Sequence, residues 1–230
     1  MSWLSREKTP GGAEILRYGK EAPQTPIGFT GESTDAFGPL RESAYQGLFG
    51  DALNVSHELI PLIPHVDVYS FRRTIVNQEV YTLVTGGMSD LPMALPRGAA
   101  GVPKRVELIF NCTEPKAEYI ATLRWLAHFP HTYKTCVSFG HTIPNGNPPE
   151  PFWGSDCLDT ILFLRPIVQR DRNLADDLFL GGDPVSFLWV VPITGAECNL
   201  KLQKGLAALM DLFSQHRHPH VFDPARKSYV

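Results

Sequence analysis

The sequence predicts an α/β (α+β) fold, in which a single compact domain holds a mixed β-sheet with helices packed on it. Short β-prone runs and one alternating run indicate several strands. Two further runs are apolar almost throughout, which is typical of central strands covered on both faces. Between and after these runs, apolar residues recur at helical spacing. The strand candidates are residues 66–71, 80–85, 105–112, 160–167 and 185–193.

The composition of the chain disfavours several classes of function. The 230 residues are 43% hydrophobic and 20% charged, as in ordinary globular proteins, and a net charge of -3 disfavours a nucleic-acid partner. The four cysteines form no CxxC pair, which argues against a zinc or redox motif. Neither a signal-peptide core nor an apolar run of membrane-spanning length is present. We therefore expect a soluble cytoplasmic protein with reduced thiols, no cofactor and no membrane partner.

The N-terminal residues 1–38 are rich in glycine, proline, threonine and charge. This composition predicts an arm that lies on the domain or is partly disordered. The segment "PLRESAYQGLFGD" then predicts a short helix that ends at Gly50. Residues 66–71 and 80–85 follow as strands, with a polar connection that fits a hairpin.

Residues 105–112 alternate between apolar and polar side chains, with Ile109 as the exception. This pattern predicts a half-buried strand with a polar outer face. A helix should begin at Pro115 and stop before Pro130. The apolar face of the strand carries Val106, Leu108, Phe110 and Cys112, and the helix places Ile120, Leu123 and Ala127 on one side.

The C-terminal part combines two buried strands with a clear helix start. Thr194 and Glu197 form a T-x-x-E capping box after the second strand. One helix should extend to about residue 215, and the polar tail from 216 to 230 should be extended. The helix stripe consists of Leu202, Leu206, Leu209 and Phe213.

Two long loops, residues 91–103 and 143–154, lie inside the domain, and such loops are often functional or mobile. Before the first loop, Gly86 and Gly87 permit a tight turn. Ser89 and Asp90 would bond nearby backbone N–H groups there, as turn residues do. A nucleophilic Ser89 is the alternative, although adjacent side chains on an extended chain point apart.

His141 lies in the glycine-flanked stretch "SFGHTIPNG". Gly140 and Gly146 can adopt positive φ, Pro144 fixes one φ, and Asn145-Gly146 favours a turn. This pattern favours an imidazole that pins the loop. Contact with a partner and acid–base catalysis remain alternatives.

The other histidines raise the question of a metal site. His128 and His131 lie three apart at a predicted helix end, with no acidic residue close behind. In the tail, "HRHPH" alternates histidines across Pro219, which gives no preformed cage. We therefore predict no metal site.

Several motifs in this order resemble the Suppressor of fused family. They are "VYTLVTGGMSDLPM", "VELIFNC", "WLAHFPH", "FGHTIPNG" and "VSFLWVVPITGAECNLKLQKG". The resemblance covers about residues 50 to 225 and is closest to short bacterial members, which correspond to the N-terminal domain of the animal protein. It implies a compact mixed α/β domain, which we place at residues 39–230. The family turn falls on Gly87, Met88, Ser89 and Asp90, and the family loop on Gly140, His141, Pro144, Asn145 and Gly146; Phe187, Trp189 and Glu197 match the final strand–helix unit.

The resemblance implies binding and not chemistry. Animal members clamp a transcription-factor segment between two domains, with the segment added as a β-strand, and this chain looks too short for the second domain. Bacterial members occur among immunity proteins of polymorphic toxin systems. The expected function is therefore a non-enzymatic, immunity-type protein that binds and neutralises a cognate toxin or regulates another partner protein.

The two motif loops would frame the binding surface. The partner-binding candidates are Met88, Ser89, Asp90, Met93, His141, Asn145, Phe152 and Trp153. Structural roles fall to Gly86, Gly87, Gly140, Pro144, Gly146, Trp189, Thr194 and Glu197. The alternative from another class is a hydrolase or metal-assisted enzyme centred on His141 with Asp90 or His131.

Overall fold

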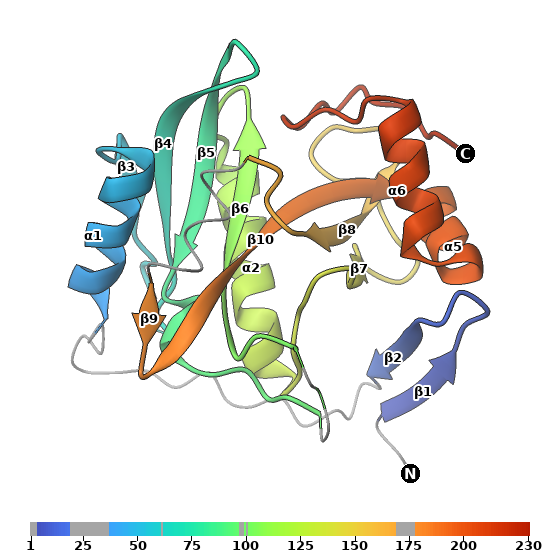
Figure 1. Cartoon of the computed structure of the whole chain (residues 1–230), viewed down its shortest axis with the longest axis horizontal. Coiled ribbons are helices and arrows are strands. Elements are labelled where there is room, and N and C mark those ends of the chain that lie inside the picture. The colour runs from blue at the N-terminus through green and yellow to red at the C-terminus, as the bar shows by residue number, and fades with distance from the viewer. Residues whose placement is uncertain (1–3, 19–36, 61, 97–98, 100, 169–177) are drawn as a thin grey trace.

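An eight-stranded mixed β-sheet forms the centre of the computed structural model (Figure 1). The strand order is β3–β4–β5–β6–β10–β8–β7, and β9 pairs with β10 outside this path. β6 and β10 are parallel, whereas the other paired strands are antiparallel. The predicted single domain with a mixed sheet is confirmed. The structure describes residues 4–18, 37–60, 62–96, 99, 101–168 and 178–230. The strands are β3 (Asn54–Ser56), β4 (Asp67–Ile75), β5 (Gln78–Gly86), β6 (Arg105–Cys112), β7 (Thr142–Pro144), β8 (Leu158–Leu164), β9 (Phe179–Leu180) and β10 (Asp183–Thr194).

Helices pack on both faces of the sheet. They are α1 (Gly38–Phe49), α2 (Ala117–Thr132), α5 (Gly195–Lys204) and α6 (Leu206–Gln215), with a 3-10 turn η1 (Met88–Asp90) after β5. α2 lies behind the sheet in Figure 1, over a core that includes Leu123. The opposite face carries two separate cores, one with Tyr45 and Phe187 under α1, the other with Trp189 and Phe213 near α6. Within the described residues, no helix combines the length and the apolar character needed to cross a bilayer.

The polar face of β6 is buried, so the half-buried strand predicted for residues 105–112 is wrong in this respect. Arg105, Glu107 and Asn111 each expose no more than 8% of their surface. β6 lies between β5 and β10, and its polar side chains have partners inside the fold. For example, Asn111 Oδ1 accepts a hydrogen bond from Thr82 Oγ1 at 2.8 Å. Alternation in sequence identifies a polar face, but buried partners can replace water on it.

The predicted hairpin is confirmed, and β4 and β5 pair along their full length. Val76 and Asn77 form its turn with φ angles of 48° and 64°. Positive φ at both central positions is typical of the type I′ turn, which matches the twist of paired strands. Asparagine tolerates this conformation, whereas a β-branched valine is strained in it. Val76 is also 76% exposed.

Replacement of that valine should stabilise the protein. We expect Val76→Asn to raise the free energy of unfolding by about 1 kcal/mol, because asparagine adopts the left-handed region with less strain. Urea denaturation followed by circular dichroism measures the change. Gln78→Asn, just beyond the turn, is the control and should alter stability little. Equal or lower stability of Val76→Asn would show that the turn is not strained.

α2 continues past the end predicted for it. The helix was expected to stop before Pro130 but runs to Thr132. A proline removes one helix hydrogen bond, and in the final turn few further bonds depend on it. The Tyr133 N–H still donates to the Phe129 carbonyl at 3.0 Å. The helix begins at Ala117, slightly later than predicted.

The single helix predicted up to residue 215 is two helices. Gly205 separates them with φ 89° and ψ 166°, a conformation outside the helical region. The Leu202 carbonyl accepts a hydrogen bond from the Gly11 N–H at 2.8 Å and not from the next helical turn. A Cβ at Gly11 would lie 2.5 Å from the Gly205 nitrogen. A close contact from the N-terminal region therefore accompanies the break.

The N-terminal region contributes a β-hairpin beside α5 (Figure 1). β1 (Leu4–Lys8) and β2 (Glu14–Tyr18) pair in antiparallel fashion. Both strands fall within the arm predicted for residues 1–38, and the hairpin contacts the α5–α6 junction through Gly11. Residues 1–3 and 19–36 of that arm lie outside the described residues. The boundary between arm and domain stays a prediction.

Candidate functional site

The turn after β5 is built around the buried carboxylate of Glu107. Ser89 donates to Oε1 from its hydroxyl at 2.6 Å and from its N–H at 3.0 Å. The Gly87 N–H donates to the same oxygen at 2.9 Å, and Thr85 Oγ1 donates to Oε2 at 2.6 Å. Burial raises the pKa of Glu107, although the charge of Arg41 and these donors oppose the shift. Four donors on one carboxylate indicate that Glu107 organises the turn.

Close approach of the backbone makes glycine necessary in this turn. Gly87 has φ 117°, and a Cβ there would lie 1.8 Å from the His65 carbonyl oxygen. From the end of α2, His131 Nε2 donates to the Met88 carbonyl at 3.0 Å. Burial lowers the pKa of His131 to about 4, so the ring is neutral near pH 7. The turn is therefore held both by Glu107 of β6 and by His131 of α2.

Ser89 and Asp90 bond to side chains of other elements, which the sequence did not predict. Their side chains were expected to accept from nearby backbone N–H groups, but the Ser89 hydroxyl donates to Glu107 and the Asp90 carboxylate pairs with Arg41 of α1. Arg105 donates to the carbonyls of Ser89 and Asp90 at 2.7 and 2.8 Å. The reason is tertiary, since α1 and β6 bring these partners to the turn. Ser89 is fully buried, so a substrate cannot reach it as a nucleophile.

The "GHTIPNG" loop is shaped largely by its backbone. The Gly140 N–H donates to the Phe163 carbonyl at 2.7 Å, and the Phe163 N–H donates to the His141 carbonyl at 3.0 Å. Gly140 has φ 81°, as its predicted role requires. Asn145 Nδ2 donates to the Glu150 carbonyl at 2.8 Å, which closes the loop. The loop is therefore a defined extension of the sheet beside β8.

The ring of His141 lies at the edge of this loop, and the residue is exposed. Desolvation of the ring and the nearby charge of Lys201 lower the pKa of His141, opposed by a hydrogen bond to the Cys136 backbone. That bond is consistent with a pinning role. The two acid–base partners considered for His141 are engaged elsewhere, Asp90 with Arg41 and His131 with the Met88 carbonyl.

Half of the predicted partner contacts lie inside the protein. Met88, Ser89, Met93 and Phe152 are each no more than 5% exposed, so they do not form a surface. The three apolar side chains fill the core under α2. Ser89 lies beside Glu107, to which its hydroxyl donates a hydrogen bond. Trp153 is only partly buried, but its ring packs against Phe110, Tyr119 and Phe222, and its Nε1 donates to Thr122. Asp90, His141 and Asn145 remain at or near the surface.

The remaining histidines take part in ordinary packing and hydrogen bonds. His128 Nε2 lies 2.7 Å from Glu58 Oε1. In the tail, His216 stacks on Tyr229, and His218 stacks on Phe213. In the part of the chain that the structure describes, no group of three or more His, Cys, Asp or Glu side chains is arranged to hold a metal ion.

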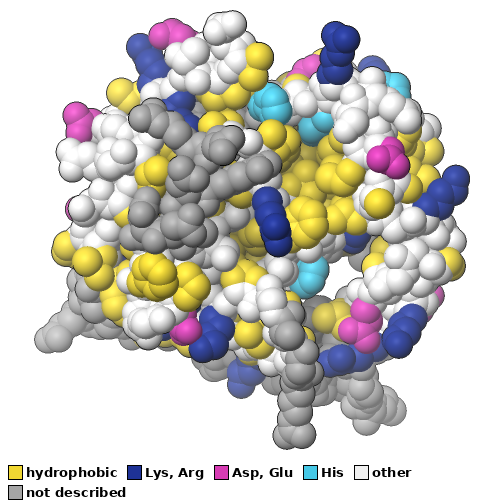
Figure 2. All heavy atoms as spheres, in the orientation of Figure 1, with side chains coloured by type: hydrophobic (Ala, Val, Ile, Leu, Met, Phe, Trp, Pro, Cys, Tyr) yellow, Lys and Arg dark blue, Asp and Glu magenta, His cyan; other side chains and the backbone are white. Residues whose placement is uncertain are grey.

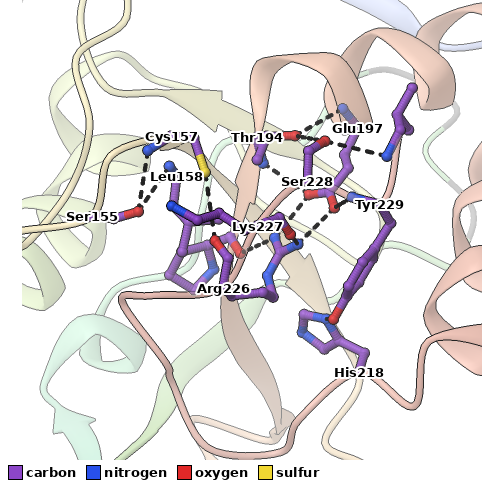
Figure 3. Close-up of polar contacts among 12 residues, drawn as sticks. Ser155, Cys157, Leu158, Thr194, Glu197, His218, Arg226, Lys227, Ser228 and Tyr229 are labelled. Carbon is purple, nitrogen blue, oxygen red and sulfur yellow. Dashed lines mark hydrogen bonds and ion pairs between the residues drawn. The ribbon is translucent and has the colours of Figure 1, made fainter.

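A buried ion pair joins the capping box to the C-terminal tail (Figure 3). The Thr194–Glu197 box is confirmed, with both reciprocal hydrogen bonds present. The Arg226 guanidinium donates to both oxygens of Glu197 at 2.6 and 2.8 Å. Although burial favours the protonated acid, these bonds lower the pKa of Glu197. Sequence reasoning found the acid but missed its arginine.

The tail is therefore not the extended polar segment that was predicted. The Tyr229 N–H donates to Glu197 Oε1 at 3.1 Å, and Ser228 Oγ lies 3.0 Å from Thr194 Oγ1. The Phe222 N–H donates to the Asn111 carbonyl of β6 at 2.8 Å. Polar residues in the tail find partners on the sheet and α5, which is why Arg226 is only 8% exposed.

An apolar groove of about 1090 Å³ opens between the β4–β5 turn, the end of β8, α6 and the tail. Figure 2 shows hydrophobic side chains gathered in a hollow on this face, with histidines at its rim. Leu164 and Phe213 are buried in its lining, and Val76, Phe139 and Ile167 are exposed around it. Sequence reasoning missed this site because its walls come from five separate stretches of sequence: 75–78, 113, 139, 164–167 and 210–224. The signal available was only single apolar residues, of which Phe139 alone belongs to a quoted motif.

Comparison with known proteins gives one family. The family model described as Suppressor of fused protein (SUFU) matches residues 63–227, which include the turn after β5, the "GHTIPNG" loop and the Glu197–Arg226 pair. Among proteins with curated descriptions, none matches the chain.

Solved structures show the same fold at low sequence identity. A putative SUFU homolog from Neisseria gonorrhoeae aligns with a TM-score of 0.62 and 19% identity, over 84% of this chain and 97% of the other. A chain of the Sufu–Fu complex gives 0.55 and 11%, over 91% and 93%. Drosophila Suppressor of Fused gives 0.55 and 10%, and 98% of this chain covers 52% of that protein. At these identities the likeness concerns the fold.

Proposed function

Because the chain belongs to the Suppressor of fused family, we propose that it is a non-enzymatic protein-binding domain. The observation that carries this proposal is the apolar groove, around which Val76, Phe139 and Ile167 expose 76%, 43% and 44% of their surface. Exposed apolar surface of this kind is typical of interaction sites. The Sufu–Fu complex, a structural neighbour, is named for a family member together with a partner, which supports the same function class.

The partner that we propose is a cognate toxin, with this chain acting as an immunity-type protein. The support is the resemblance to short bacterial members and the similarity to the Neisseria gonorrhoeae homolog. To neutralise a toxin, an immunity-type protein needs a complementary surface that covers or distorts the toxin. It does not need to catalyse a reaction. A preformed groove provides such complementarity with little loss of conformational entropy on binding.

No contact in the described residues favours the alternative of a hydrolase or metal-assisted enzyme at His141. The enzyme considered at His141 would pair this histidine with Asp90 or His131 within hydrogen-bond reach. Asp90 is committed to Arg41, and His131 is committed to the Met88 carbonyl. Both side chains therefore hold the turn after β5 and do not assist His141. We propose that the domain acts by binding a partner.

The test uses the product of the neighbouring gene. We expect this chain to co-purify with that product and to protect cells from growth arrest when the two are co-expressed. The double variant Phe139→Glu with Ile167→Glu should weaken the complex at least about tenfold, because it places charge on apolar contact surface. Leu59→Glu is the matched control, since Leu59 is 95% exposed but lies outside the groove. Calorimetry gives the affinities.

Two outcomes would count against the proposal separately. If the groove variant folds and binds as tightly as the parent, the groove is not the binding surface. If the neighbouring product forms no complex and the chain gives no protection from it, the immunity-type function is wrong. Circular dichroism of each variant checks that the fold is intact.

A further inference from the structure

The walls of the groove carry unpaired positive charge. Arg165 follows β8 and Arg217 follows α6, and both side chains line the groove on exposed residues. Neither forms an ion pair within the described part of the chain. Among the described residues of the lining, Asp223 is the acidic one, so the two arginines outweigh it. A surface with this balance attracts a negatively charged ligand.

One of these arginines is held over apolar surface. The Arg165 guanidinium lies 5.3 Å from the centroid of the Phe139 ring, in cation–π contact. Such stacking restricts the side chain but leaves its N–H groups available to an incoming acceptor. A ligand can therefore meet an apolar ring and a cation at the same place.

Two histidines of the groove, His218 and His220, contribute packed rings and one buried polar atom. His218 stacks on Phe213 with ring centroids 4.0 Å apart, and its Nδ1 lies 3.2 Å from the Tyr229 hydroxyl. Burial lowers the pKa of His218 to about 3, so the ring adds no charge at neutral pH. Nδ1 of His220 is buried and has no hydrogen-bond partner among the described residues. A buried polar atom without a partner is unusual in a native protein.

Backbone strain falls on two residues that line the groove. Arg217 has φ 50° just after α6, where its N–H donates to the Ser214 carbonyl and the His218 N–H donates to the Phe213 carbonyl. This bonding is a Schellman motif, in which glycine usually occupies the position of Arg217. Val76, in the β4–β5 turn that forms another wall of the groove, also has a positive φ. Strain retained on exposed side chains is a reason to look for a function of those side chains.

We infer that the groove receives a segment of a partner protein in which apolar side chains alternate with carboxylates. The inference rests on the proposed function and names the chemistry of the partner. Apolar side chains would fill the space beside Val76, Phe139 and Ile167, and carboxylates would pair with Arg165 and Arg217. Planar guanidinium groups bind carboxylates through two parallel hydrogen bonds. A fatty acid carries one carboxylate and would leave one arginine unpaired, so a peptide segment fits better.

Two fluorescein-labelled peptides of 15 residues test the inference directly. Both carry leucine and phenylalanine at the same alternate positions, with glutamate at the remaining positions of one peptide and lysine in the other. We expect fluorescence anisotropy to show that the glutamate peptide binds at least about tenfold more tightly than the lysine peptide. The preference should decrease with added salt, because exposed charges are screened.

Charge reversal tests whether the groove, and not the overall charge of the protein, causes the preference for the glutamate peptide. In the double variant Arg165→Glu with Arg217→Glu, the glutamate peptide should lose its advantage. The matched control is Lys116→Glu with Lys204→Glu, which changes the net charge equally at exposed residues outside the groove and should keep the preference. Arg217→Gly should raise the melting temperature while weakening the glutamate peptide several-fold, a combination that a purely structural arginine would not give.

The inference is overturned if neither peptide binds, if both bind equally, or if charge reversal leaves the preference unchanged. Native mass spectrometry that finds a fatty acid in the purified protein, or a dimer that is lost on charge reversal, would also overturn it. These results are distinct from failure of the proposed function. A neighbouring-gene product that binds the charge-reversed protein normally, but not Phe139→Glu with Ile167→Glu, would keep the protein-binding function and reject only the acidic segment.

Discussion

Arg226→Ala should lower the free energy of unfolding by about 3–5 kcal/mol. Glu197 has no exposed surface, and without the guanidinium its carboxylate would be a buried charge with only the backbone N–H groups of Thr194 and Tyr229 as donors. The capping box of α5 and the docking of the tail depend on the same carboxylate. Urea denaturation at pH 7, monitored by tryptophan fluorescence, measures the loss.

Controls can isolate the buried pair. Lys227→Ala removes an adjacent cation whose ion pair with Asp156 is largely exposed, and it should change stability by less than about 1 kcal/mol. The double variant Glu197→Met with Arg226→Met should cost less than Arg226→Ala, since it leaves no unpaired charge. Equal stability of Arg226→Ala and the parent would show that the pair is not formed in solution.

Acid should remove the contribution of this pair. The folded pKa of Glu197 is lowered, so the stabilisation is complete above the unfolded value of about 4.3 and is lost as the pH falls through the lower folded value. The stability difference between the parent and Arg226→Ala should therefore be constant near neutral pH and shrink in the acid range. A difference that grows on acidification would contradict the assignment.

Gly87→Ala should destabilise the protein by at least about 3 kcal/mol or prevent folding. A Cβ at this position would meet the His65 carbonyl oxygen at 1.8 Å, and the backbone has φ 117°. The strained conformation disfavours alanine, and the clash forces the turn away from Glu107, which would lose its donors. Thermal and urea denaturation measure the effect.

Gly50→Ala is the matched control for conformational strain. Gly50 also has positive φ, 83°, but a Cβ there has no atom within 4 Å. We expect this variant to lose about 1–3 kcal/mol, and less than Gly87→Ala, because φ 83° with ψ -161° is a conformation adopted almost only by glycine. Similar losses for the two variants would show that the contact with His65 relaxes easily and that the turn is not rigid.

Local patterns in the sequence predicted the elements on which the site is built. The helix ending at Gly50, the β4–β5 hairpin, the buried strands β8 and β10 and the Thr194–Glu197 box are all present. The turn at Gly87 was also predicted correctly as a tight turn. Each of these features depends on residues within a few positions of one another, so propensity and periodicity carry the information.

Features that depend on residues far apart were not predicted. Glu107 and Ser89 are 18 positions apart, and Glu197 and Arg226 are 29 apart, yet each pair forms buried hydrogen bonds. No periodicity links such positions, so Met88, Met93 and Phe152 could be mistaken for surface residues. The burial of these side chains follows from the way α2 and the tail pack on the sheet.

The residues by themselves therefore determined which segments become strands, helices and turns, because those choices are made among near neighbours in the chain. Only the tertiary structure decided which polar groups are buried, where α5 ends and where an open apolar groove is left. Packing brings five separate stretches of sequence to that groove, and whether acidic peptides prefer its two arginines is the measurement that tests its role.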